Sequence, residues 1–173
     1  MFNEQEIYTT IKMLKSENLD VRTVTLGINL LDCVSHDLEI LKDNIRKKIT
    51  GLARDLVKTC DRVGDKYGIQ VVNKRIAISP IAVVAAPFSP DQMVEIAKTL
   101  NEIAVDVNVD FIGGFSALVE KGMANGDKSL IKAIPRALTE TDRICASVNV
   151  ASTRAGINMD AVLEMSKAIK EAA

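Results

Sequence analysis

The segment ICASVNV (residues 144–150) alternates apolar side chains with small or polar ones at every step. Because successive side chains of a β-strand point to opposite faces, this pattern is typical of a strand with one apolar and one polar face. The segments TVTLGIN (23–29) and NKRIAIS (73–79) show the same alternation, and helical patterns separate all three, which favours parallel strands. Parallel strands are usually buried on both faces. The polar faces therefore predict a sheet that helices cover on one side only, with a wet space on the other.

The composition indicates one globular domain. At 173 residues and a net charge of −1, the chain can bury a core and offers no electrostatic basis for binding nucleic acid. Residues 1–6 lack the features of a signal peptide, and no apolar run approaches the roughly 20 residues that span a bilayer. The three cysteines form no CxxC pair. We therefore expect a reduced cytoplasmic protein with no membrane or nucleic-acid partner, no disulfide framework and no zinc site.

Local signals set the element boundaries. An apolar stripe from Leu38 to Tyr67 keeps a 3.6-residue period, which predicts one helix of about 45 Å that ends at Gly68. Ser89 and Gln92 flank a proline at the first position of a helix, as in a capping box. We predict helices at 3–17, 36–66 (capped by Ser35), 89–107, 116–122, 127–141 (kinked or broken at Pro135) and 159–172 (capped by Asn158), strands at 21–28, 69–79, 109–113 and 144–150, and a loop or turn at 81–86.

This order predicts one α/β domain over residues 1–173, a parallel (βα) half-barrel. Right-handed crossovers place successive helices on the same face while the strand order advances in one direction. Four strands cannot close a barrel, since about eight are needed for a filled one. Either a partner chain supplies the remaining strands or the chain is part of a longer architecture.

Function in parallel α/β folds sits at the carboxyl ends of the strands, so polar residues there are the candidate site. Gly113 and Gly114 join a predicted strand to a predicted helix, and either bind an anion through free N–H groups or form a turn that needs positive φ. Arg154 either holds a carboxylate or phosphate or belongs to an ordinary polar loop. The candidate ligand-binding residues are Asn29, Asn73, Arg75, Ser79, Gly113, Gly114, Ser116, Asn149, Ser152, Thr153 and Arg154.

Arg75 is the sharpest of these candidates. Alternation places Asn73 and Arg75 on the polar face, and Lys74 towards the helices. A charge inside a barrel must be paired or bind a ligand. The alternatives are a ligand anchor and a structural salt bridge to Asp32 or Asp110.

Cys33, beside Asp32 at the end of the first strand, is the candidate reactive group, with a small buried residue as the alternative. Cys60 lies on the helical stripe and is assigned to the core, whereas Cys145 faces the lumen near the start of its strand. His36 is the only histidine, and its place just after a helix cap assigns it to an exposed first turn. On that assignment, no histidine remains for a Ser-His-Asp or Cys-His system within this chain. No metal or cofactor motif is present, so the cofactor stays open.

Five segments together resemble the N-terminal part of an uncharacterised prokaryotic family, domain of unknown function 711 (uncharacterised protein family 0210), often labelled "PFL family protein". They are Thr25–Cys33, Val72–Arg75, Val109–Leu118, Ile134–Leu138, and Ser147–Asn149 through Gly156–Met159. The resemblance implies a cytoplasmic homodimer, a chain much longer than this one, and a barrel similar to the ten-stranded barrel of pyruvate formate-lyase and ribonucleotide reductase. This chain would then supply about one half-barrel.

Three functions remain open on this basis. The first is an enzyme or enzyme fragment that binds a small anionic metabolite at the strand ends, with Cys33 or Asp32 reactive. The second is a non-catalytic oligomeric or regulatory half-barrel whose polar face is an assembly surface. The third, a thiyl-radical enzyme, follows from analogy of fold alone, since no region of this chain could serve as the C-terminal glycine loop of such enzymes.

Overall fold

The structure is a computed structural model that describes residues 3–16, 21–69 and 71–173. In chain order its elements are α1 (Glu4–Ser16), β1 (Val21–Ile28), a 3-10 turn η1 (Leu31–Cys33), α2 (Leu38–Ala53), α3 (Leu56–Tyr67), β2 (Val71–Ile78), α4 (Ile81–Val84), α5 (Pro90–Asp106), β3 (Phe111–Leu118), α6 (Asn125–Thr139), β4 (Ile144–Asn149), β5 (Ala151–Ser152), β6 (Gly156–Ile157) and α7 (Met159–Ala172). None of the helices in the described ranges is both long and apolar enough to cross a membrane.

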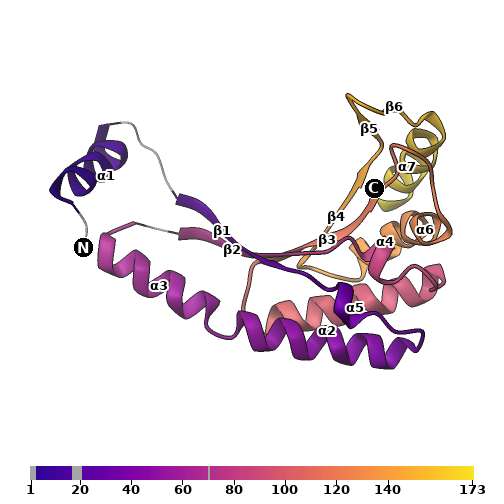
Figure 1. The fold of residues 1–173 in the computed structure, drawn as a ribbon, viewed down its shortest axis with the longest axis horizontal. Coiled ribbons are helices and arrows are strands. Elements are labelled where there is room, and N and C mark those ends of the chain that lie inside the picture. The colour runs from indigo at the N-terminus through magenta and orange to yellow at the C-terminus, as the bar shows by residue number, and fades with distance from the viewer. Residues whose placement is uncertain (1–2, 17–20, 70) are drawn as a thin grey trace.

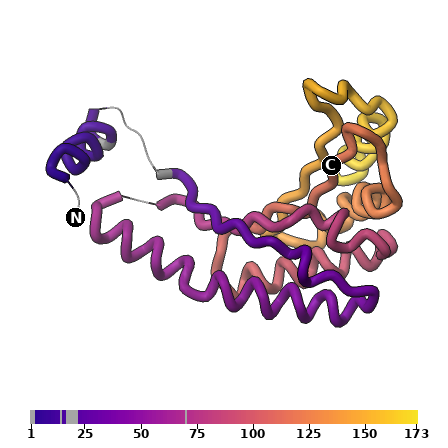
Figure 2. Tube along the Cα trace, viewed as in Figure 1, coloured from indigo at the N-terminus to yellow at the C-terminus, as the bar shows by residue number. Residues whose placement is uncertain are grey.

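Strands β1 to β4 form one parallel sheet in the order β1-β2-β3-β4, which confirms the predicted α/β class and the one-way advance of the strands. The Cα trace runs from α1 at one end of the molecule to α7 at the other (Figure 2). Helices α2, α3 and α5 lie along one side of the sheet, and no helix of the described residues spans the other side (Figure 1). The sheet is therefore covered on one face only, as the alternating pattern predicts.

The core lies between this covered face and the helices. Ile76 and Ile112 of the central strands are completely or almost completely buried, and Leu41, Ile45 and Leu100 meet them from α2 and α5. Burying one such side chain contributes about 1.5–3 kcal/mol. The strand residues between the buried ones, such as Arg75, face away from the helices and are exposed.

The single long helix predicted over 36–66 is wrong, because the chain breaks at Arg54-Asp55 into α2 and α3. A straight helix of about 45 Å would overrun strands of eight residues, which are about 26 Å long. The break lets α2 contact α5 while α3 contacts β2. The predicted cap is also wrong: Asp37 Oδ1 accepts from the N–H groups of Glu39 (2.9 Å) and Ile40 (3.0 Å). Ser35 Oγ instead accepts from Asp37 N–H (3.1 Å).

The strand predicted at 109–113 is present as β3, but it continues to Leu118, so its predicted end and the predicted helix 116–122 are wrong. A β-bulge between Gly113 and Phe115 shifts the register with β4, and Gly114 adopts φ 124°. The extra residue breaks the period-2 pattern, so that Phe115 and Ala117 both reach the core. This irregularity is why alternation in the sequence missed the second half of the strand.

Several smaller features of the structure confirm the sequence predictions, and others differ from them. Gly68 ends α3 with φ 65°, Ser89 and Gln92 form the predicted capping box of α5, and Asn158 caps α7. The predicted loop at 81–86 contains the short helix α4, and α6 continues as a helix through Pro135. A small hairpin, β5–β6, follows β4.

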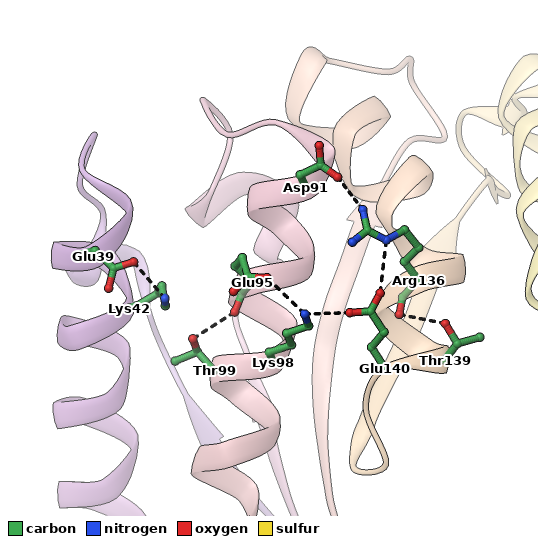
Figure 3. Close-up of polar contacts among 9 residues, drawn as sticks. All are labelled: Glu39, Lys42, Asp91, Glu95, Lys98, Thr99, Arg136, Thr139 and Glu140. Carbon is green, nitrogen blue, oxygen red and sulfur yellow. Dashed lines mark hydrogen bonds and ion pairs between the residues drawn. The ribbon is translucent and has the colours of Figure 1, made fainter.

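A surface ion-pair network joins α5 to α6 (Figure 3). Lys98 Nζ lies 2.8 Å from a carboxylate oxygen of Glu140 and 3.3 Å from one of Glu95, and Arg136 bridges Glu140 (3.3 Å) to Asp91 (2.5 Å). The hydrogen bond from Lys98 lowers the pKa of Glu140, with a smaller contribution from Arg136. Since these groups are exposed, solvent screens the network.

Gly114→Ala is expected to destabilise the fold by about 3 kcal/mol, because φ 124° strains an L residue and the new Cβ would lie 2.5 Å from Ile78 O. Gly113→Ala is the matched control, since a Cβ there meets nothing within 4 Å, and a change within about 0.5 kcal/mol is expected. Urea unfolding measures both variants. Equal losses of stability in the two would contradict this account of the bulge.

Glu140→Gln is expected to lower the melting temperature at neutral pH and to have little effect in acid. A lowered folded-state pKa means that Glu140 stabilises the fold above its ordinary pKa of 4.5, and that this contribution is lost as pH falls through the folded value. Thermal unfolding from neutral pH down to about pH 3 tests this window. Asp142→Asn is the control, since Asp142 makes no ion pair within the described residues. A pH-independent difference would refute the linkage.

Candidate functional site

The uncovered side of β1–β4, here the open face, carries the sequence-predicted polar residues in cross-strand rows. One row pairs Thr25 with Arg75 and Arg75 with Phe111. The next row runs Gly27–Ala77–Gly113–Cys145 across all four strands. A Cβ added at Gly27 or Gly113 would meet nothing within 4 Å. The open face is thus a floor of small side chains with Arg75 at its side.

Arg75 is held by an aromatic ring and not by a carboxylate. Its guanidinium carbon lies 5.4 Å from the centroid of the Phe111 ring. The salt bridge to Asp32 or Asp110 that the sequence left open is not formed: Asp32 pairs with Lys48, and Asp110 Oδ2 accepts from Lys74 N–H (2.7 Å). Within the described ranges Arg75 makes no ion pair, so its charge is available to a ligand.

Lys74 and Asn73, the neighbours of Arg75, have structural partners. Lys74 reaches past the helical side of the sheet to Asp61 on α3, with Nζ 3.0 Å from Oδ1, in agreement with the predicted direction. Asn73 Nδ2 donates to Arg22 O across β1 (3.5 Å). Neither side chain joins the candidate residues at the carboxyl ends of the strands.

Asn29 and Ser79 tie the ends of β1 and β2 together. Ser79 Oγ donates to Asn29 Oδ1 (3.0 Å) and accepts from Leu30 N–H (3.1 Å). Asn29 Oδ1 also accepts from Leu31 N–H (2.9 Å). These two predicted ligand residues therefore use their polar atoms to shape the loop after β1.

Gly113, Gly114 and Ser116 lie inside β3, and not at a helix start. The anion site proposed for a helix N-terminus therefore lacks its helix, and the positive φ at Gly114 serves the bulge. Ser116 is buried, and its Oγ donates to Gly114 O (3.3 Å).

The residues after β4 form the β5–β6 hairpin, away from Arg75. Ser152 Oγ accepts from Ala155 N–H (3.0 Å), while Asn149, Thr153 and Arg154 are exposed. Counted along β4, the row of Asn149 lies six residues beyond the row of Arg75, about 20 Å at strand spacing. The structure thus does not bring Arg75 and Arg154 into one site.

Cys33 and Asp32, the tentative catalytic pair, lie in η1 beneath α2. Cys33 is 3% exposed, and burial, with the nearby charge of Asp32, raises the pKa of its thiol. The hydrogen bond from Lys48 lowers the pKa of Asp32. Because the reactive form of cysteine is the thiolate, this setting favours the alternative of a small buried residue. Cys60 is buried on α3 as expected, whereas Cys145 is exposed on the open face.

Glu120, in the turn after β3, is a residue that sequence reasoning missed. Its Oε2 atom is buried and has no hydrogen-bond partner among the described residues. Buried carboxylate oxygens without partners are costly and uncommon. No pattern in the sequence indicates that Glu120 is buried, and the sequence predicts a helix over residues 116–122 where the structure has the end of β3 and a turn.

Grooves between the helices lie away from the open face. One of about 680 Å³ lies where α2 and α3 meet the end of α5, with Arg54 and Lys58 in its lining. Another of about 350 Å³ separates α6 from α7 and includes Ile131 and Leu163. The described part of the chain contains no group of three His, Cys, Asp or Glu residues placed to hold a metal ion.

These features define an α/β protein whose four-stranded parallel sheet, covered on one face, is consistent with part of an α/β barrel. The chain belongs to the family described as Uncharacterised ACR (DUF711), whose profile matches residues 12–173. It is 63% identical over 169 residues to a UPF0210 protein of Desulfovibrio desulfuricans, covering 98% of this chain and 37% of the relative. It is 61% identical to a UPF0210 protein of Syntrophobacter fumaroxidans and 52% identical to one of Methanocaldococcus jannaschii. These matches cover 100% of this chain and 38% and 40% of the relatives, so the chain spans about two fifths of their length.

Cys145 is expected to react with a maleimide about 100-fold faster than Cys33 at neutral pH, because it is exposed while burial raises the pKa of Cys33. Mass spectrometry of labelled peptides measures both rates. In the Cys145→Ser variant, labelling should wait for unfolding by urea. Rapid labelling of the folded Cys145→Ser variant would show that Cys33 or Cys60 is more accessible than the structure indicates.

Proposed function

We propose that the open face binds a small anionic metabolite, with Arg75 as the anchor. The observation that carries the proposal is the guanidinium of Arg75, which stacks over the Phe111 ring and has no ion-pair partner among the described residues. A guanidinium matches carboxylate and phosphate geometry through two parallel hydrogen bonds. Stacking on an aromatic ring restricts its motion before a ligand arrives, which reduces the entropy lost on binding.

The neighbouring row supports the same proposal. Gly27, Ala77 and Gly113 leave space above the sheet beside Arg75, and Cys145 and Ser147 contribute the nearest polar atoms on β4. A ligand could therefore lie flat on the small residues while its anionic group meets Arg75. Asn149 and Arg154 lie farther along the sheet and would contact only a longer ligand.

The proposed site would be enclosed by further structure above the open face. The resemblance noted from the sequence suggests a ten-stranded barrel of the pyruvate formate-lyase and ribonucleotide reductase type, in a cytoplasmic homodimer, with the open face as about half of the inner wall. The relatives are long enough to supply the other wall, since this chain spans about two fifths of their length. Removing water from the space above Arg75 would strengthen its attraction for an anion.

A non-catalytic half-barrel whose open face is an assembly surface is the second candidate. The observation that favours it is the uncovered face itself, because parallel sheets are usually buried on both sides. Light scattering and maleimide labelling of Cys145 together test the second candidate: a stable oligomer in which Cys145 is protected would support assembly, whereas a monodisperse monomer would exclude it.

Arg75→Met is expected to abolish stabilisation of the chain by inorganic phosphate or small dicarboxylates, while Arg75→Lys retains part of it. At a ligand concentration about 100 times Kd, binding stabilises by about 2.7 kcal/mol, or about 5–10 °C in Tm for a chain of this size. Thermal-shift measurements report this change. Arg62→Met is the matched control, an exposed arginine on α3 away from the open face.

Two results would count against the proposal. One is an equal ligand shift in the Arg75→Met and unsubstituted chains. The other is the absence of any ligand-induced rise in Tm, both in the 173-residue chain and in a full-length family protein that contains this chain.

A further inference from the structure

Helix α7 has a second apolar face that nothing in the described structure covers. Ala161 and Ala168 are buried, and α7 contacts α6. Met159, Leu163 and Ile169 are 67%, 56% and 63% exposed. At 100° per residue these three side chains fall within an arc of about 120°, which they share with the exposed polar residues Ser166 and Lys170.

Helix α5 provides an internal comparison. It contacts α2 on one side and α6 on the other, and it buries eight residues. Within the described part of the chain, helix α7 packs closely against α6 alone and buries two residues. The exposed apolar arc of α7 thus corresponds to surface that α5 buries against its second neighbour.

The main sheet also ends near this helix in the chain, at β4. Strand β4 pairs with β3 along one edge, and its other edge has no partner among the described residues. Free strand edges and exposed apolar faces are both features that further structure normally covers. Because the strand order advances from β1 to β4 and α7 follows β4, a right-handed crossover would place the next strand beside β4 and under α7.

We propose that this surface, the β4–α7 edge (the free edge of β4 with Met159, Leu163 and Ile169), docks a further βα unit of a polypeptide equivalent to the unmatched three fifths of the relatives. Its strand would pair in parallel with β4 and its helix would pack on the apolar arc of α7. The occupant is inferred from length, since about three fifths of each matched relative lies outside the region aligned with this chain. A single contiguous βα unit satisfies both the strand edge and the helix face.

The proposal goes beyond the proposed function, because the docked polypeptide would carry a second wall over the open face. The two are tested through different residues. Docking at Leu163 can hold even where Arg75 binds no anion, and anion binding by Arg75 can hold where Leu163 stays exposed.

The experiment measures solvent access to the β4–α7 edge in a full-length chain. The matched 169 residues of the Desulfovibrio desulfuricans relative are replaced by this chain, in a Cys145→Ser background, with Leu163→Cys as the probe. Val105→Cys is the matched control, an exposed apolar position on α5. Both variants are also made in the 173-residue chain.

In the 173-residue chain, both cysteines should react with a maleimide at comparable rates. In the full-length chimera, Leu163→Cys should react at least tenfold more slowly, while Val105→Cys keeps its rate. Leu163→Glu should lower the Tm of the chimera by several degrees and leave that of the 173-residue chain unchanged, since Leu163 is exposed there.

Three results would overturn the proposal. The first is equal labelling of the two cysteines in the chimera. The second is protection of Leu163→Cys in the 173-residue chain that grows with protein concentration, which would assign the surface to a second copy. The third is an insoluble chimera beside a soluble parent relative, which would show that the remainder does not recognise this edge.

Discussion

The fold depends on the burial of one face, and only one face, of four parallel strands. Ile76 and Ile112 are sealed under α2 and α5, and strand geometry then forces the residues between them onto the opposite side. The same alternation that secures the core therefore presents Arg75, Gly113 and Cys145 to whatever lies beyond the open face. No shift of register could change this arrangement without exposing the core.

The fold was predictable from sequence where the signals are local. The capping box at Ser89, the left-handed end at Gly68 and the alternation in β1, β2 and β4 each depend on neighbouring residues, and each is confirmed. The bulge at Gly114 disrupts the period that identifies a strand, so β3 was half missed. The break between α2 and α3 escaped because the apolar stripe keeps its helical phase across Arg54-Asp55, and only the length of the sheet requires the bend.

The candidate site was less predictable, because the availability of a polar group depends on its tertiary partners. Ser79 and Asn29 have the composition of ligand-binding residues, yet their oxygens bond to each other and to the adjacent backbone. Asp32 forms an ion pair with Lys48 of the following helix. It is therefore not the salt-bridge partner of Arg75 that the sequence left open. The Oε2 atom of Glu120, which is buried and has no hydrogen-bond partner among the described residues, carries no signal in the sequence, because its burial exists only in the folded chain.

The proposed binding on the open face and the proposed docking at the β4–α7 edge would be linked by electrostatics. A guanidinium and an anion 4 Å apart attract by about 1 kcal/mol in bulk water and by about 4 kcal/mol at the lower effective dielectric of a partly enclosed site. Arg75 is exposed in this chain, so its attraction for an anion is close to the first value. A polypeptide docked at the β4–α7 edge would exclude water from above the sheet and move the interaction towards the second. By linkage, an anion that Arg75 binds more tightly in the closed state also stabilises the docked polypeptide by the same free energy.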